Sequence, residues 1–212
     1  MRALALVLGL CLAPFAQAGD LFALPVTPEA LAKQFTGRLH GLQRAEGLKG
    51  NFAQKKKLAG IARPLAAGGT FLFVRRRGIL WHTTTPFDSQ FVLTAGKMEV
   101  TEGGSVAMRL HTAEQPGLKL VSDIFLAMFA LDFEALARHF DLYAIDGKPW
   151  RIGLAPRDAT LKAVATRIVL TGTDVVTGVV LEDAHGDRSE ITFDGVKHLQ
   201  TVAPADLERF GS

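Results

Sequence analysis

The chain has 212 residues, 48% of them hydrophobic, and carries 24 lysines and arginines against 21 aspartates and glutamates. This near-neutral balance argues against a nucleic-acid-binding protein, which usually needs a strongly basic domain. A single cysteine cannot form an intramolecular disulfide, so the fold must rest on its core, and at this length one core can bury roughly 70% of the unfolded chain's surface.

The first 18 residues predict a secretory signal peptide. Met1 and Arg2 supply a positive start, residues 3–15 are apolar, and Ala16-Gln17-Ala18 fits an A-x-A cleavage site. A lipoprotein signal at Cys11 is the alternative, but this cysteine stands too early in the chain and lacks a small residue before it. We expect residues 1–18 to be cleaved from an exported protein and residues 19–212 to form one domain.

A helix is predicted to begin at Thr27-Pro28-Glu29. This segment offers a hydroxyl N-cap, a proline at the first helical position and an acid beside the positive end of the helix dipole. Leu31, Phe35, Leu39 and Leu42 follow at spacings that line one helical face. We expect this helix to cover the core.

Residues 48–58 predict the first strand. Phe52 and Gln54 share a face with Lys56, because residues two apart in a strand point to the same side. The run Lys55-Lys56-Lys57 is interpreted as a solvated rim in preference to a specific anion site.

Three runs of β-branched and aromatic residues follow, at 70–74, 79–83 and 90–93, and predict consecutive antiparallel strands. The first is apolar on both faces, because Phe71 and Phe73 alternate with aliphatic residues. Such a strand needs apolar partners on both sides. We therefore expect the sheet to wrap around a core or cavity, or to be covered by helices, although periodicity alone favours a filled sandwich core.

Residues 97–101 and 105–112 predict a hairpin around Glu102-Gly103-Gly104. In the second arm Val106 and the alternate residues after it are apolar, while those between them are mostly polar. This alternation is typical of a half-buried strand.

Two helices are predicted next. Ser122-Asp123 offers an N-cap for residues 124–131, which are apolar all round, and such a helix is buried or meets apolar surface on its second side. Asp132 is expected to cap a second helix, with Phe133, Leu136 and Phe140 on one face. These helices interrupt an otherwise all-β pattern.

The remaining segments predict more strands, at 140–145, 150–154, 167–171, 175–182 and 189–194. A short helical crossing is expected between Pro156 and Ala165, and a terminal helical turn over 204–210. The total is eleven strands, which places the protein in the mainly-β class with added helices.

No catalytic motif is found: there is no G-x-S-x-G elbow, no H-E-x-x-H pair and no phosphate loop. His82, Asp88 and Ser89 are close in sequence, but they resemble strand-end and turn residues. The segment 183–187 has side chains that suit a cation, yet a hairpin turn explains the same residue types. We expect a binding protein that is not an enzyme and has no cofactor and no metal site.

Large apolar side chains are abundant, with fourteen phenylalanines against one tyrosine. Many cores use phenylalanine, so this count decides little alone. Together with an export signal, a curved all-β sheet and a helix that is apolar all round, it suggests a cavity for an acyl-like ligand.

The sequence resembles the LolA-like outer-membrane lipoprotein carriers. The resemblance rests on Phe52-Ala53-Gln54 after an N-terminal helix and on the stretch from Gly69-Thr70-Phe71 to Trp81. Pro86-Phe87, Gly96, Trp150, Leu154, Pro156 and the closing strands over 168–193 extend it across most of residues 27–197.

This resemblance implies an incomplete antiparallel β-barrel of about eleven strands with a helical lid over an apolar cavity. It also implies a monomeric periplasmic carrier for an acylated cargo, handed from an inner-membrane exporter to an outer-membrane acceptor. The residues expected to bind the cargo are Phe52, Phe71, Phe73, Trp81, Phe91, Ile124, Phe125, Met128 and Phe129.

The resemblance also implies an arginine that latches the lid. In the family it lies in an Arg-Pro pair before the strand that ends in tryptophan. Counting back from Trp81 assigns this role to Arg75, with Arg76 in place of the proline. The triple arginine up to Arg77 leaves open which arginine acts as the latch, and suggests a divergent branch with a different lipid as cargo.

Two alternatives stay open at this stage. One is a lipid-modifying enzyme that uses the same cavity through Asp88, His82 or His139. The other is a structural β protein whose core is filled and binds no ligand.

Overall fold

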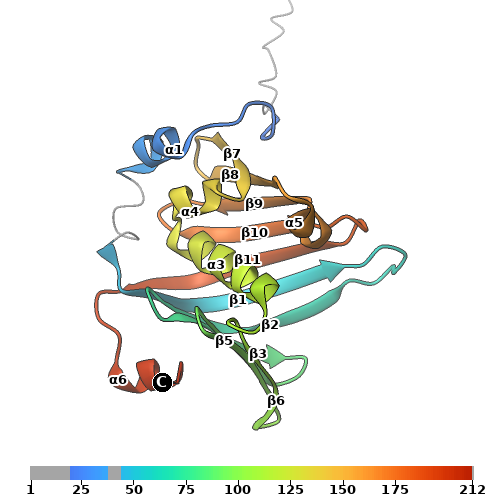
Figure 1. The fold of residues 1–212 in the computed structure, drawn as a ribbon, viewed down its shortest axis with the longest axis vertical. Helices are drawn as coiled ribbons and strands as arrows, with labels where there is room; N and C mark the ends of the chain where they lie inside the picture. Colours follow the sequence, from blue (N-terminus) through green and yellow to red (C-terminus); the bar gives the residue numbers. More distant parts are fainter. Residues whose placement is uncertain (1–19, 38–43, 212) are drawn as a thin grey trace, which may run out of the picture.

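A computed structural model of the protein describes residues 20–37 and 44–211. Its centre is an antiparallel sheet of eleven strands in the order β6-β5-β4-β3-β2-β1-β11-β10-β9-β8-β7 (Figure 1). Consecutive strands pair as neighbours except β6 and β7, and β1 pairs with β11. Because β6 and β7 are the two edge strands and do not pair with each other, the barrel is open. The predicted fold class, mainly β with an incomplete antiparallel barrel, is confirmed.

The predicted strands are all present, with bounds that differ by a few residues. They are β1 Gly47–Lys57, β2 Leu65–Val74, β3 Gly78–Thr85, β4 Ser89–Thr94, β5 Lys97–Glu102, β6 Ser105–His111, β7 Phe140–Ile145, β8 Trp150–Pro156, β9 Arg167–Gly172, β10 Val176–Glu182 and β11 Arg188–Leu199. The helices are α1 Pro28–Phe35, α3 Pro116–Ala130, α4 Phe133–Ala137, α5 Ala159–Val164 and α6 Pro204–Glu208.

Helix α1 begins as predicted. The Thr27 hydroxyl accepts a hydrogen bond from the Ala30 backbone N–H at 3.2 Å, and Leu31 and Phe35 are fully buried. Leu39, Leu42 and the predicted signal peptide lie outside the described residues. Within the described part of the chain, no helix is long and apolar enough to span a bilayer.

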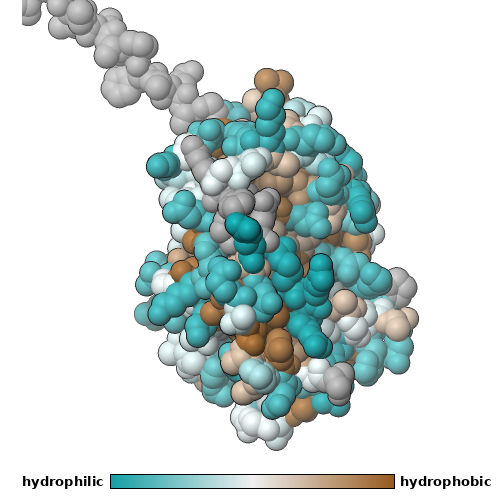
Figure 2. All heavy atoms as spheres, turned by 90° about the vertical axis from the view of Figure 1, so that its left-hand side faces the viewer, coloured by the Kyte–Doolittle hydropathy of each residue, from teal (hydrophilic) through white to brown (hydrophobic). Residues whose placement is uncertain are grey.

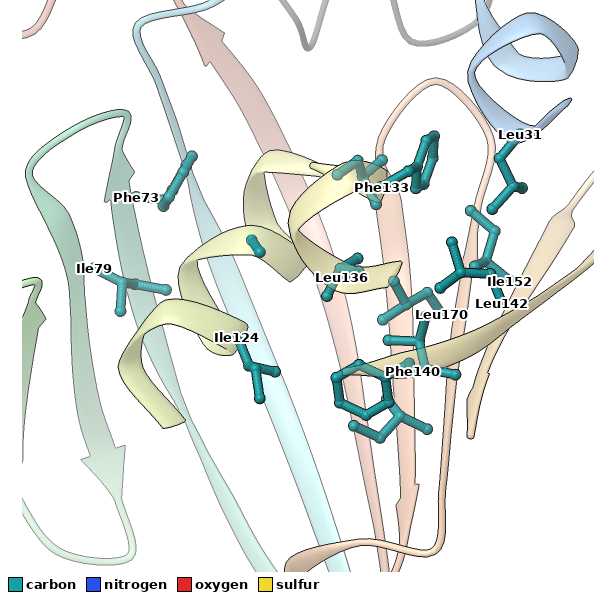
Figure 3. Close-up of a cluster of buried hydrophobic side chains, with 14 of the residues drawn as sticks. Leu31, Phe73, Ile79, Ile124, Phe133, Leu136, Phe140, Leu142, Ile152 and Leu170 are labelled. Carbon is teal, nitrogen blue, oxygen red and sulfur yellow. The ribbon is translucent and has the colours of Figure 1, made fainter. Parts of the chain in front are cut away.

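Helices α3 and α4 lie against one face of the sheet (Figure 1), which we call the inner face because it carries Phe71 and Phe73. The buried side chains of this face form one cluster. It extends from Phe73 and Ile79, on β2 and β3, to Leu142 and Ile152, on β7 and β8, with the two helices between them (Figure 3). The helices therefore fill the space that the curved sheet encloses.

Helix α4 is held by its own cap and by the core. The carboxylate of Asp132 accepts a hydrogen bond from the Ala135 backbone N–H at 3.0 Å, as predicted, and Phe133 and Leu136 are buried. Phe140 is buried too, but it begins β7 and so does not belong to the helix. This cap fixes the sharp connection between α3 and α4.

The opposite, outer face of the sheet is covered by the end of the chain. Leu72, Val74, Leu80 and Val92 form a second buried cluster with Phe210, which is only 2% exposed. The segment that contains α6 brings this phenylalanine onto the outer face. The expectation that residues 70–74 have apolar partners on both sides is thereby confirmed.

Two further predictions about local structure were wrong. Helix α3 begins at Pro116, six residues before the expected Ser122 cap, because proline suits the first helical position and Gln115 serves as N-cap without a side-chain bond. Strand β6 is exposed along almost its whole length, although half-burial was predicted. Apolar and polar residues do alternate in β6, but β6 is an edge strand and lies beyond the helices that cover the inner face. Most of its apolar side chains are therefore exposed.

Candidate functional site

An aromatic cluster occupies the inner face where β11, β1, β2 and β3 run side by side. Phe52 on β1 is the cross-strand partner of Phe193 on β11, and Phe71 on β2 is the partner of Trp81 on β3. Directly paired residues project to the same face. Gly69, the partner of Phe52 on β2, has no side chain, so the rings of Phe52 and Trp81 meet across β2 with centroids 4.0 Å apart.

Helix α3 inserts Phe129 into this cluster. The Phe129 ring centroid lies 5.8 Å from Phe71, 5.7 Å from Phe73 and 5.8 Å from Phe193, and Phe125 of the same helix is 5.3 Å away. Aromatic pairs at these separations attract each other beyond simple area burial. Phe129 is therefore the side chain through which α3 packs against the aromatic residues of the inner face.

A cavity of about 40 Å³ remains between α3 and the sheet, and its lining is entirely apolar. It is lined by Trp81, Phe125, Met128, Phe129, Leu170, Val176, Val179, Ile191 and Phe193. For comparison, an engineered apolar cavity that binds benzene has a volume of about 150 Å³. With α3 in this position, the space is closed to an acyl chain.

The structure brings most of the predicted cargo-binding residues to this place. Trp81, Phe125, Met128 and Phe129 line the cavity, and Phe52, Phe71 and Phe73 lie against their rings. Phe91 is the cross-strand partner of Trp81 and is partly buried, whereas Ile124 is buried beside Phe73 in a second hollow.

Sequence reasoning missed the contribution of the closing strands. Leu170, Val176, Val179, Ile191 and Phe193 supply more than half of the cavity lining. The alternation of Ile191 and Phe193 in the predicted strand 189–194 was the available signal. What it could not reveal is the pairing of β11 with β1, which joins residues more than a hundred positions apart.

The arginine expected to latch the lid lies in a tight turn between β2 and β3. Arg75 donates its Nε–H to the carbonyl of Ala45 at 3.3 Å, and its backbone N–H to the carbonyl of Glu46. It lines the same hollow as Ile124 of α3. Arg75 therefore lies near α3, and the hydrogen bond of its side chain anchors the residues that lead into β1.

The residues named for the enzyme alternative do not form a triad. His82 Nε2 lies 2.7 Å from Asp88 Oδ1, on the exposed surface. However, His82 pairs with Gln90 while Ser89 pairs with Thr83, so the serine points to the opposite face of the sheet from the histidine. His139 lines a different hollow, beside α3 and α4.

The segment 183–187 is stabilised as a turn. The Asp183 carboxylate accepts hydrogen bonds from the backbone N–H groups of His185 and Asp187 at 2.8 and 3.0 Å. Desolvation opposes ionisation, but these bonds and the nearby charges of His185 and Lys56 outweigh it and lower the pKa of Asp183. No group of three potential metal-binding side chains occurs within residues 20–37 and 44–211.

The family model described as outer membrane lipoprotein carrier protein LolA matches residues 43–208. A search of curated proteins finds no match.

Several solved structures are similar in fold. A LolA superfamily protein from Nitrosomonas europaea is 11% identical, with a TM-score of 0.44 over 81% of this chain and 96% of that one. An outer membrane lipoprotein-sorting protein domain from Vibrio parahaemolyticus is also 11% identical, with a TM-score of 0.45 over 86% and 96%. The MucA/MucB complex of Pseudomonas aeruginosa gives 14% identity and a TM-score of 0.46 over 83% and 60%.

Proposed function

The chain belongs to the LolA family of outer membrane lipoprotein carrier proteins, and we propose that it is a periplasmic carrier and not an enzyme. In this proposal, cleavage of residues 1–18 leaves residues 19–212 as a single carrier domain. It binds the acyl chains of a lipoprotein or of another lipid-like amphiphile beneath α3. An inner-membrane exporter supplies the cargo and an outer-membrane acceptor receives it from the monomeric carrier.

The position of Phe129 among Phe71, Phe73 and Phe193 is the observation that supports this function best. The helix that carries Phe129 fills the apolar space with its own side chains when no cargo is present. Acyl chains would take over the same surface, so binding and lid closure compete.

The energies of the two states are comparable, as a carrier requires. Each buried methylene contributes about 0.8 kcal/mol to acyl binding. Burial of a phenylalanine or methionine side chain contributes about 1.5–3 kcal/mol to lid closure. Three or four side chains of α3 therefore offset several methylenes, which keeps the cargo releasable.

Displacement of an uncharged fluorescent probe, N-phenyl-1-naphthylamine, by a long-chain acyl ligand tests this proposal. We expect saturable probe binding that one equivalent of ligand abolishes. A probe that never binds, or that acyl ligands fail to displace, would favour the structural alternative with a filled core. Recovery of a chemically altered ligand after incubation would favour a lipid-modifying enzyme.

A further inference from the structure

A second hollow, of about 350 Å³, lies on the other side of α3, between this helix, α4 and the β2–β3 turn. Its apolar part includes Phe73, Ile124 and Ala127, and its rim includes Arg75, Arg76 and Arg138. Figure 2 looks onto the end of the sheet where β1 begins and β2 ends, and shows mostly hydrophilic side chains with small hydrophobic areas between them. The lining residues give the hollow an apolar wall and a basic rim.

The acidic groups at this hollow are already engaged. Asp123 pairs with Lys119 at 2.6 Å, and Asp132 accepts the hydrogen bond that caps α4. Arg76 and Arg138 are exposed, and no hydrogen bond or ion pair of their side chains occurs within the described parts of the chain. Two guanidinium groups are thus available to an anion.

The backbone at Arg76 supports a role for its side chain. Arg76 adopts a φ of 64°, in the left-handed region that glycine or asparagine adopts at lower cost. The Arg77 backbone N–H closes the tight turn onto the Val74 carbonyl at 3.0 Å. This turn holds Arg76 in the lining of the hollow.

The hollow adjoins the proposed acyl site. Phe73 lines the hollow on one side and stacks on Phe129 on the other, and Ile124 and Ala127 come from the helix that closes the acyl site. Two further hollows, of about 380 and 390 Å³, also contain Arg76, but neither includes a residue of the aromatic cluster. Only the hollow at α3, among these three, therefore adjoins the proposed acyl site.

We propose that this hollow binds the anionic headgroup, a phosphate or a carboxylate, of the amphiphile whose chains lie beneath α3. The inference rests on the proposed carrier function and specifies its cargo as an anionic acyl amphiphile. Planar guanidinium groups bind phosphate and carboxylate oxygens through paired, charge-assisted hydrogen bonds. Arg76 and Arg138 are the principal ligands of the headgroup.

The test compares ligands that share a chain and differ in headgroup: hexadecyl phosphate, hexadecanoate and uncharged hexadecanol, each displacing N-phenyl-1-naphthylamine. We expect both anions to bind about tenfold more tightly than the alcohol, because exposed guanidinium–anion bonds contribute modestly. The double variant Arg76→Gln/Arg138→Gln should remove this difference and leave hexadecanol binding unchanged. Unchanged hexadecanol binding also shows that the variant is folded.

A matched control removes the same charge elsewhere. Arg44→Gln/Arg77→Gln alters two exposed arginines that do not line this hollow, and should preserve the preference for anions. Equal binding of all three ligands by the native protein would overturn the headgroup site while leaving the carrier function intact. An equal loss in the control variant would also overturn it. Inorganic phosphate that competes as strongly as hexadecyl phosphate would overturn it too, because the hollow would then bind the free anion and not the headgroup of an amphiphile. Failure of every ligand to bind would instead refute the carrier function.

Discussion

The ring of Phe129 on α3 stacks on the ring of Phe73 on β2, with centroids 5.7 Å apart and planes inclined by 29°. This contact joins α3 to the strand whose side chains are buried on both faces. The proposed acyl space lies on one side of it and the basic hollow on the other. We expect cargo that enters beneath α3 to separate these two rings.

Replacement of Phe129 by alanine should therefore have opposite effects on stability and binding. We expect Phe129→Ala to lower the free energy of unfolding by about 2–3 kcal/mol, since the side chain is largely but not fully buried. Affinity for a long-chain acyl ligand should rise, because the lid no longer fills the site. Urea unfolding and probe displacement measure the two effects. Phe87→Ala, at a side chain that is 80% exposed, is the control and should change neither.

Arg75 offers a test of the lid latch. We expect Arg75→Leu to accelerate amide hydrogen exchange in α3 and to impair release of cargo to an acceptor, because a latch formed by this guanidinium would stabilise the closed state through charge-assisted hydrogen bonds. Arg77→Leu, in the same turn, should leave exchange in α3 unchanged. If Arg75→Leu accelerates exchange only around Ala45 and Glu46, the arginine anchors the start of β1 and does not latch the lid.

The C-terminal segment should contribute to stability without taking part in binding. Phe210 is 2% exposed and covers Leu72 and Val92 on the outer face. Phe210→Ala should cost about 3–5 kcal/mol in the free energy of unfolding, as for other buried phenylalanines. Acyl affinity at a temperature where the variant is folded should equal that of the native protein. A change in affinity would show that the two faces of the sheet are coupled.

The sequence predicted most of the fold because its strands are joined by local hairpins. The runs that contain Phe71, Trp81 and Phe91 are each bounded by glycine or proline, so their order and shared face follow from local pattern. The N-terminus of α3 was misplaced, because Ser122 has the side chain of an N-cap. In the structure its hydroxyl is buried within the helix, with no hydrogen-bond partner among the described residues.

The missed part of the site depends on distant contacts. Phe193 joins the cluster only because β11 pairs with β1, and no local pattern encodes that register. The exposure of β6 was missed for the same reason, because the alternation in Val106 and its neighbours cannot reveal whether a helix covers the strand. The basic hollow combines Arg76 with Arg138, from the β2–β3 turn and the end of α4, and so required the fold.

The turn at Asp183 predicts a pH dependence. Hydrogen bonds and nearby charges hold the pKa of Asp183 below its ordinary value of 3.8, although desolvation opposes them. The ionised carboxylate therefore stabilises the folded state at neutral pH, and this contribution is lost as pH falls through the lowered pKa. Asp183→Ala should lower the urea midpoint at pH 7 more than at pH 2.5. Asp174→Ala, in the β9–β10 turn, should have the same effect on the midpoint at both pH values. A rise in midpoint with added calcium would instead indicate a cation site.

Movement of α3 on cargo binding distinguishes a carrier from a static binding protein. Spin labels at Val121 on α3 and Lys55 on β1, both exposed, report the position of α3 relative to the sheet. Protein that retains residues 1–18 also needs Cys11→Ser, so that the labels attach only at these two positions. We expect the distance distribution to shift when hexadecanoate is added, because the chain and Phe129 compete for one apolar site. A second pair, Lys55 and Val106, lies within the sheet and should keep its distance. If the first distance also stays fixed while the ligand binds, acyl chains are held without lid displacement and the carrier mechanism proposed here is wrong.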